Sequence, residues 1–170
     1  MHVRTFHTIA LSVGFGLLTG GLGVPQTAVA APAAVAVTRA LPTTGRTVAA
    51  RSQLAGLRVV TEAARHRGKP YLFGASGPNR FDCSGFTMYV YRKTTGKSLP
   101  HKADLQQRYG RAVSRSAARP GDLIILRNGS YGFHAGIYAG GGQMWAAPRA
   151  GKTITKQKIW TSNYVVRRLT

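Results

Sequence analysis

The hydrophobic pattern of this chain changes from helical to strand-like at Pro120-Gly121, and this change limits the folds open to it. Before the change, apolar residues recur at helical spacing in residues 51–67, from about 83 to 95, and in a short stretch at 102–109. After it, runs of β-branched and aromatic residues are separated by Gly, Asn and Ser turns. Helices followed by strands predict an α+β domain in which N-terminal helices pack on a C-terminal antiparallel β-sheet.

The same periodicities predict individual strands and buried helix faces. Strands are expected at residues 123–126, 133–139, 143–146, 153–160 and 164–169. The face of the first helix that is expected to be buried carries Leu54, Leu57, Val59, Val60 and Ala64. The expected inner stripe of the second helix is Phe86, Tyr89 and Val90.

Residues 1–30 have the order of a secretory signal peptide. A short basic start is followed by an apolar, Gly-rich stretch at 8–24, by Pro25, and by the small-residue triplet Ala28-Val29-Ala30. A retained transmembrane anchor is the alternative, but about twenty strongly apolar residues are needed to span a bilayer and this stretch is shorter. We therefore predict cleavage after Ala30, export from the cell, and no stable membrane insertion.

Residues 31–50 separate this leader from the rest of the chain. They are rich in Ala, Val, Thr and Pro without a sustained period, which is typical of a linker. The motif Leu41-Pro42-Thr43-Thr44-Gly45 spells a cell-wall sorting signal, but such a signal belongs near a C-terminus. We interpret it as a Pro-Thr-Gly turn in the linker and assign residues 51–170 to one domain.

The charge balance indicates an anionic partner. The chain contains 24 Lys and Arg but 4 Asp and Glu, a net charge of +20, and loss of Arg4 with the leader leaves 20 − 1 = +19. Such a surplus favours binding to nucleic acid, a membrane surface or an anionic polymer, and self-repulsion favours a monomer. We expect no metal and no cofactor, because one cysteine and four carboxylates offer too few ligands.

The single cysteine, Cys83, is a candidate nucleophile. A lone thiol can be a small buried hydrophobe. The element Asp82-Cys83-Ser84-Gly85 favours another interpretation, because it follows a Gly-rich turn and opens a helix. Backbone N–H groups and the positive end of the helix dipole lower the pKa of a thiol, and the same N–H groups could hold an oxyanion. Asp82 could instead simply cap the helix.

A thiolate nucleophile needs a base, and three histidines lie outside the leader. His66, among arginines at the end of a helix, is interpreted as a solvated or C-terminal helix residue. His101 precedes a short helix and either reaches the site or caps that helix. His134 begins a strand, which gives the rigid orientation that a base requires, so it is the preferred base.

Three segments in order, PYLFGASGPNRFDCSGF, ARPGDLIIL and HAGIYAGGGQMWAAP, resemble the NlpC/P60 family of bacterial cell-wall cysteine peptidases. The resemblance covers residues 50–170 and implies a papain-like catalytic domain. It implies hydrolysis of an amide bond in the peptidoglycan stem peptide, between D-Glu and the diamino acid, with Cys83 as nucleophile and His134 as base. It places Tyr71, Asp82 and Ser84 in the substrate pocket.

The sequence departs from the family pattern at one position. The family supplies a third polar residue, on the strand after the base, which orients the imidazole; the matching residue here is Ala146. Either a backbone carbonyl or Gln143 orients His134, or the site is a Cys–His dyad of reduced activity, or the chain is a non-catalytic relative that only binds. Retention of both Cys83 and His134 favours the dyad.

Two further function classes stay open. An acyl-transferring enzyme, or an amidase acting on another wall bond, would use the same Cys–His pair. A secreted nucleic-acid-binding protein would stack bases on its aromatic residues, which include Tyr89, Tyr91, Tyr109, Trp145 and Trp160. These residues follow helix and strand periods, however, and no nucleic-acid motif is present. We therefore expect a secreted, wall-associated hydrolase with no nucleic-acid partner, held by charge on anionic wall polymers.

Overall fold

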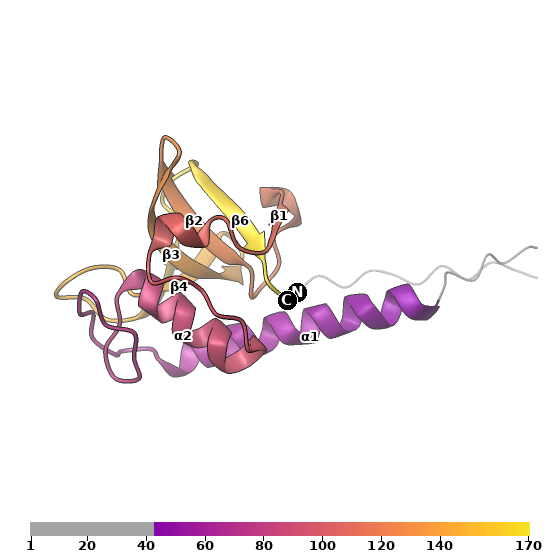
Figure 1. Cartoon of the computed structure of the whole chain (residues 1–170), viewed down its shortest axis with the longest axis horizontal. Coiled ribbons are helices and arrows are strands. Elements are labelled where there is room, and N and C mark those ends of the chain that lie inside the picture. The colour runs from indigo at the N-terminus through magenta and orange to yellow at the C-terminus, as the bar shows by residue number, and fades with distance from the viewer. Residues whose placement is uncertain (1–42) are drawn as a thin grey trace, which may run out of the picture. The chain divides into compact units, whose positions relative to one another are not determined.

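The computed structural model describes residues 43–170, and in Figure 1 the long helices lie on one side of a single sheet. The predicted signal peptide at 1–30 and residues 31–42 of the predicted linker lie outside the described residues. Within residues 43–170, no helix is both long enough and apolar enough to cross a membrane.

Six strands form one antiparallel sheet in the order β1-β6-β2-β3-β4-β5. They are β1 (Arg111–Val113), β2 (Leu123–Asn128), β3 (Tyr131–Gly140), β4 (Gln143–Ala146), β5 (Thr155–Lys158) and β6 (Tyr164–Arg168). All five predicted strands form, with small differences at their ends. No sequence pattern predicts β1 or the 3-10 helix that follows it at Arg115–Ala117, because three residues are too few to show a period.

Three α-helices pack on this sheet: α1 (Thr43–Arg65), α2 (Cys83–Thr95) and α3 (Ala103–Gln106). Each of them contacts β3. Helix α2 has the predicted bounds, because Asp82 caps its start and Gly96, in the left-handed region, ends it. The predicted α+β architecture, with helices first and an antiparallel sheet after them, is confirmed.

Helix α1 begins earlier than the predicted residue 51. It starts at Thr43, so Thr43–Gly45 form its first turn and not a turn in a linker. Residues 43–50 contain one glycine and no proline, and they are followed directly by good helix formers, so nothing in the sequence stops the helix from extending backwards.

The buried face of α1 agrees with the prediction at Val59, Val60 and Ala64, which pack in or against the core, and differs at its two leucines. Leu54 and Leu57 are 58% and 48% exposed, whereas Val59 and Ala63 are fully buried. The cause is the close approach of Gly56 to the turn before β2, where a Cβ at Gly56 would lie 2.4 Å from the Pro120 carbonyl oxygen. This contact turns the Gly56–Ala63 side of the helix toward the sheet.

The hydrophobic core lies on both faces of the sheet. The larger part, between sheet and helices, includes Val59, Phe86, Val90, Leu123, Ile125, Ala135 and Ile137. Alternate residues of the strands point to the other face and form a smaller cluster of Ile124, Leu126, Met144, Ala146 and Val166. The N-terminus of α2 is thereby held firmly against β3, and the candidate site forms there.

Candidate active site

Helix α2 begins at Cys83 because Asp82 caps it. The Asp82 carboxylate accepts hydrogen bonds from the N–H of Gly85 at 2.7 Å, from the Ser84 hydroxyl at 3.2 Å and from the N–H of Gly74 at 2.9 Å. The capping role that the sequence allows for Asp82 is confirmed. These bonds fix Cys83 as the first residue of the helix.

Gly85 is needed because the first turn of α2 is covered by two other segments. A side chain at Gly85 would place its Cβ 2.2 Å from the carbonyl oxygen of Ala75 and 2.8 Å from Nε2 of His101. The turn around Ala75 and the His101 imidazole therefore both lie directly on the helix start. This packing explains why the Asp-Cys-Ser-Gly element ends in glycine.

His101 reaches the site, which is one of the two roles that its position allows. Its Nε2 lies 2.9 Å from both carboxylate oxygens of Asp82, next to the candidate nucleophile. The cap residue of α3 is Lys102 and not His101. The side chain of His101 is 30% exposed, so it forms part of the outer wall of the site beside Asp82.

The Cys83 sulfur is half-buried against β3. Burial raises the pKa of the Cys83 thiol, and the hydrogen bond from the backbone N–H of Ala135 offsets only part of this effect. Backbone N–H groups of Ser84 and Cys83 also stabilise the thiolate, as the helix-start argument predicts. The predicted net lowering of the pKa is nevertheless wrong, because burial outweighs the backbone donors.

His134 lies on β3 directly before Ala135, the residue whose backbone N–H donates a hydrogen bond to the Cys83 sulfur. The pairing of β2 with β3 passes from Leu126↔His134 to Arg127↔Gly132, which leaves Phe133 as an extra residue on β3. Such a β-bulge changes the direction of the neighbouring side chain. His134 is 5% exposed, and burial lowers its pKa to about 4. Its imidazole is therefore neutral at pH 7 and able to accept a proton.

Nε2 of His134 is buried and has no hydrogen-bond partner among the described residues. Ala146 is fully buried. The pairs Ile137↔Trp145 and Tyr138↔Met144 extend to Gly136 opposite Ala146, which puts Ala146 on the same face as His134. Neither Gln143 nor a backbone carbonyl among the described residues bonds this nitrogen. Of the arrangements that the sequence allows, orientation of Nε2 by Gln143 or by a backbone carbonyl is therefore absent among the described residues, and the dyad and the non-catalytic relative both stay open.

His66 is buried, so the prediction of a solvated residue is wrong. Its Nε2 lies 3.0 Å from Oε1 of Glu62, and its Nδ1 lies 3.0 Å from Nζ of Lys69. The ring makes edge contacts with Phe81 and Tyr89. Burial lowers the pKa of His66 although Glu62 opposes this effect. His66 directly follows α1, as expected, but it packs in the core because α2 and the 69–81 segment cover it.

Gln106 is a supporting residue that no motif in the sequence indicates. It is fully buried, and its Nε2 donates to the carbonyl oxygens of Ser84 at 2.9 Å and Pro100 at 2.8 Å. Its Oε1 accepts a hydrogen bond from the Thr87 hydroxyl at 2.7 Å. Gln106 thus joins α3, the segment that carries His101, and the first turn of α2.

Tyr71 and Ser84, the other two residues expected in the substrate pocket, differ in their surroundings. Burial raises the pKa of Tyr71, and the nearby negative charges of ionised Cys83 and Asp82 raise it further. Tyr71 is thus half-buried and close to both groups. Ser84 is 6% exposed and its hydroxyl is bonded to Asp82, so it supports the cap from inside.

The candidate site residues are a thiol with backbone N–H groups around it at a helix start, and an imidazole that is neutral at pH 7. Within residues 43–170, no group of three or more His, Cys, Asp or Glu side chains is placed to hold a metal ion. The residues present can perform nucleophilic attack by sulfur with a histidine as proton acceptor, which is the chemistry of acyl transfer to or from an amide.

Comparison with known proteins agrees with this geometry. A model of the NlpC/P60 family matches residues 68–169, which is more than half of the chain. The probable endopeptidase p60 of Listeria grayi is 48% identical over 93 residues, covering 55% of this chain and 18% of that protein. The gamma-DL-glutamyl hydrolase of Bacillus subtilis is 41% identical over 124 residues, covering 69% of this chain and 30% of that protein. The chain thus matches less than a third of the length of either relative.

Solved structures share the fold over most of the described residues. The NlpC/p60 domain of the peptidoglycan hydrolase SagA matches with a TM-score of 0.61 and 35% identity, covering 65% of this chain and 97% of that domain. The match therefore includes nearly all of the SagA domain, and the resemblance indicated by the three sequence segments is confirmed.

Proposed function

Because the chain belongs to the NlpC/P60 family, we propose that it is a cysteine endopeptidase that cuts an amide bond in the peptidoglycan stem peptide, between D-Glu and the diamino acid. The observation that carries the proposal is the position of the Cys83 sulfur, at the start of α2, against the backbone N–H of Ala135, the residue after His134. The name of the Bacillus relative, a gamma-DL-glutamyl hydrolase, supports the choice of a D-Glu bond.

The reaction begins with both groups neutral, since burial raises the pKa of Cys83 and lowers that of His134. As the sulfur attacks the carbonyl carbon, its proton passes to His134. The N–H groups at the start of α2 stabilise the oxyanion. His134 then gives the proton to the leaving amine, and a water molecule, activated by the same imidazole, hydrolyses the thioester and restores the thiol.

We assign substrate binding to the residues around the sulfur. The Tyr71 hydroxyl lies close enough to Cys83 and Asp82 to be influenced by their charges, so it would contact a bound stem peptide. Asp82 and Ser84 contribute mainly by fixing the helix start, because the Asp82 carboxylate already binds Gly74, Gly85 and the Ser84 hydroxyl.

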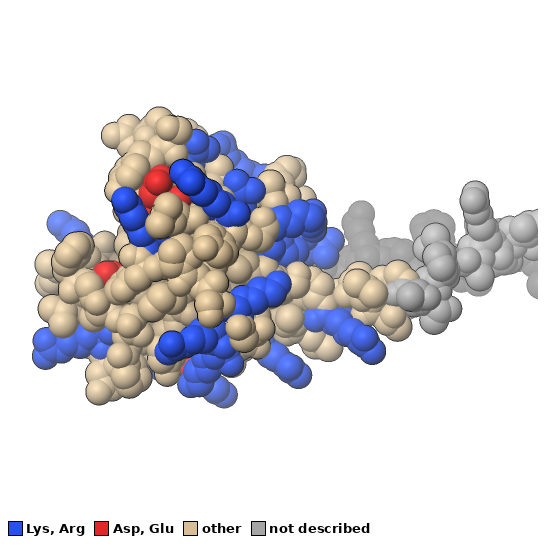
Figure 2. Space-filling model, in the orientation of Figure 1, with Lys and Arg blue, Asp and Glu red and all other residues tan. Residues whose placement is uncertain are grey.

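Charge would retain the exported protein on anionic wall polymers. All four carboxylates of the chain are engaged: Glu62 with Lys93, Asp82 with His101, Asp104 with the Gly132 N–H, and Asp122 with Arg168. Lys and Arg, by contrast, are scattered over the surface seen in Figure 2, where few acidic atoms are visible. Because all four carboxylates are engaged, a phosphate-bearing polymer would meet a surface whose remaining charges are positive.

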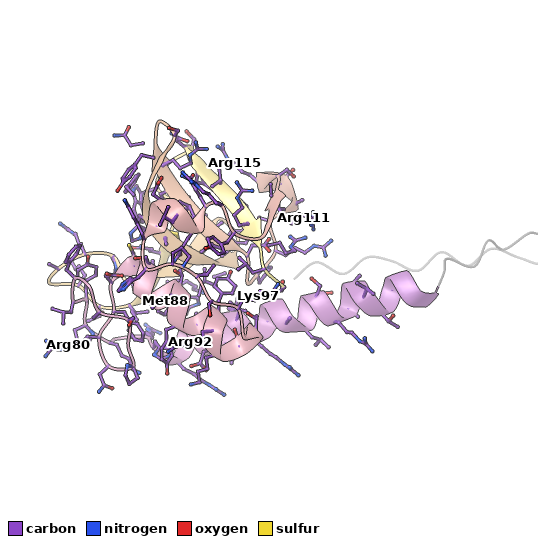
Figure 3. All side chains as sticks on the ribbon, viewed as in Figure 1. Arg80, Met88, Arg92, Lys97, Arg111 and Arg115 are labelled. Atoms are coloured by element: carbon purple, nitrogen blue, oxygen red, sulfur yellow. The ribbon has the colours of Figure 1, made fainter. Side chains whose placement is uncertain are left out.

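The basic side chains are also widely spread. In Figure 3, Arg80 lies in the loop before α2, Arg92 on α2 itself, and Arg111 and Arg115 near β1. This distribution favours contact with an extended polymer over recognition of one small anion. Two of the aromatic residues considered for base stacking, Tyr91 and Trp145, belong to the core, which weakens the nucleic-acid alternative.

The proposal is tested by incubating the purified protein and its Cys83→Ala variant with peptidoglycan fragments and identifying the products by mass. Cleavage between D-Glu and the diamino acid, lost in the variant, is the expected result. A product joined to an added amine would instead indicate acyl transfer. If neither form yields a product while both sediment with walls, the chain is a binding relative that has lost catalysis, which the unpartnered Nε2 of His134 would explain.

A further inference from the structure

The imidazole of His134 packs against the indole of Trp160. The ring centroids are 5.3 Å apart and the ring planes are tilted by 44°. Trp160 lies in the connection between β5 and β6, twenty-six residues along the chain from His134. No sequence pattern joins the two residues, and the contact exists only because the sheet brings this connection over the start of β3.

The backbone around Trp160 is anchored on both sides. Directly before it, the N–H of Ile159 donates to the Gly142 carbonyl at 2.9 Å. After it, the Asn163 carbonyl accepts a hydrogen bond from the N–H of Arg127 at 2.9 Å, and the N–H of Asn163 donates to the Thr161 hydroxyl at 3.1 Å. The backbone that carries Trp160 is therefore fixed on both sides, although the residue is 54% exposed.

We propose that Trp160 is the positioning residue of this site: its indole holds the His134 imidazole by ring packing, in place of the hydrogen bond that Ala146 cannot make. The inference rests on the proposed function, because it assigns His134 the role of base. A large, flat side chain packed at a tilt against the imidazole limits rotation of that ring, which is the task of the missing polar residue.

The surroundings of His134 fit this role. The residue paired with it on β2 is Leu126, and β4 contributes Ala146 on the same face of the sheet. On α2, the Cys83 sulfur accepts a hydrogen bond from the backbone N–H of Ala135, the residue that follows His134. Burial is the one cause of the low pKa of His134, with no contribution from a charged side chain among the described residues. Removal of the indole would therefore allow the His134 imidazole to rotate and would expose it to water.

The test compares three variants of the purified protein. Trp160→Ala removes the packing, Trp160→Phe keeps an aromatic ring, and Tyr109→Ala removes an aromatic residue of similar exposure outside the site. We expect Trp160→Ala to lower kcat by about tenfold or more with KM changed less than about threefold, because a mobile base accepts the proton less efficiently. The kcat values of Trp160→Phe and Tyr109→Ala should stay within about threefold of the kcat of the parent protein.

A second measurement does not depend on activity. In the Cys83→Ala background, NMR titration of His134 should give a pKa that Trp160→Ala raises by about one unit or more, toward the value of a hydrated imidazole. Trp160→Phe should leave that pKa close to the parent value. Because no turnover is needed, this result separates failure of the positioning role from failure of the proposed peptidase activity.

A double-mutant cycle with Ala146→Asn completes the test. If the amide introduced by Ala146→Asn bonds Nε2 of His134, the ring is held without the indole. In that background, Trp160→Ala should therefore lower kcat by less than about threefold. Three results would overturn the proposal. The first is an unchanged pKa of His134 in Trp160→Ala, and the second is an effect of Trp160→Ala on KM alone. The third is an equal loss of kcat on Trp160→Ala with and without Ala146→Asn. The second would make Trp160 a substrate contact.

Discussion

His134 and Ala146 lie on the same face of the sheet, on neighbouring strands β3 and β4, yet no hydrogen bond links this pair. Nε2 of His134 is buried without a partner among the described residues, and Ala146 is fully buried beside it in the smaller core cluster. A buried polar atom without a partner is unfavourable. The pair therefore marks the place where a polar side chain on β4 could supply a hydrogen bond to the proposed base.

Replacement of Ala146 by Asn should increase the rate. The amide can bond Nε2 of His134 and fix the ring, and we expect kcat to rise by about three- to tenfold. The larger side chain in a packed cluster should lower the free energy of unfolding by about 1–3 kcal/mol. Ala146→Leu is the matched control, because it adds similar volume without a hydrogen-bonding group. It should lower the free energy of unfolding by a similar amount and leave kcat unchanged. An unchanged rate in Ala146→Asn would mean that this position does not limit catalysis.

The stability of the protein should fall as the pH falls below about 6.5. The pKa of His134 is about 4 in the folded protein because the residue is buried, against about 6.5 for an exposed histidine. Between these values the unfolded chain binds a proton that the folded protein does not, so protonation favours unfolding and removes up to about 3 kcal/mol.

Urea unfolding at several pH values between 8 and 4 measures this effect. His134→Gln should show a shallower decline than the parent protein over this window. Part of the decline should persist in the variant, because burial also lowers the pKa of His66. Identical slopes in the two proteins would contradict the buried, neutral state of His134.

Gln106 should be essential for the shape of the site although it touches no reacting atom. Gln106→Leu keeps the volume but leaves the Ser84 carbonyl, the Pro100 carbonyl and the Thr87 hydroxyl without this partner. We expect a loss of about 2–4 kcal/mol in the free energy of unfolding and a lower kcat, since the first turn of α2 loosens. Gln107→Leu, on the neighbouring, less buried residue, is the control and should cost less than about 1 kcal/mol. Equal losses in the two variants would argue against the network.

Binding to cell walls should depend strongly on salt. If long-range charge retains the protein, sedimentation with purified walls should be nearly complete at low ionic strength and largely lost at roughly 1 M salt, where the Debye length is about 3 Å. Walls stripped of phosphate-bearing polymers should retain much less protein at low salt. Release that is independent of salt would refute electrostatic retention, and the Cys83→Ala variant separates retention from cleavage.

The sequence by itself determines most of the helices and strands and places Cys83, the proposed nucleophile, at a helix start. Strand and helix periods predict α2, α3 and five of the six strands, because alternation and helical spacing are local properties. Asp82 and Gly85 likewise place Cys83 at a helix start, since capping bonds join residues that are close along the chain. The lack of a polar residue at Ala146 can also be read directly.

Tertiary structure decides how these residues behave. The pKa of Cys83 is raised and not lowered, His66 is buried and not solvated, and the buried side of α1 is set by Gly56 against the turn at Pro120. The contact between His134 and Trp160 likewise joins distant segments. In each case the deciding quantity is burial by residues far along the chain, which depends on how the sheet and helices close around a group and not on its sequence neighbours.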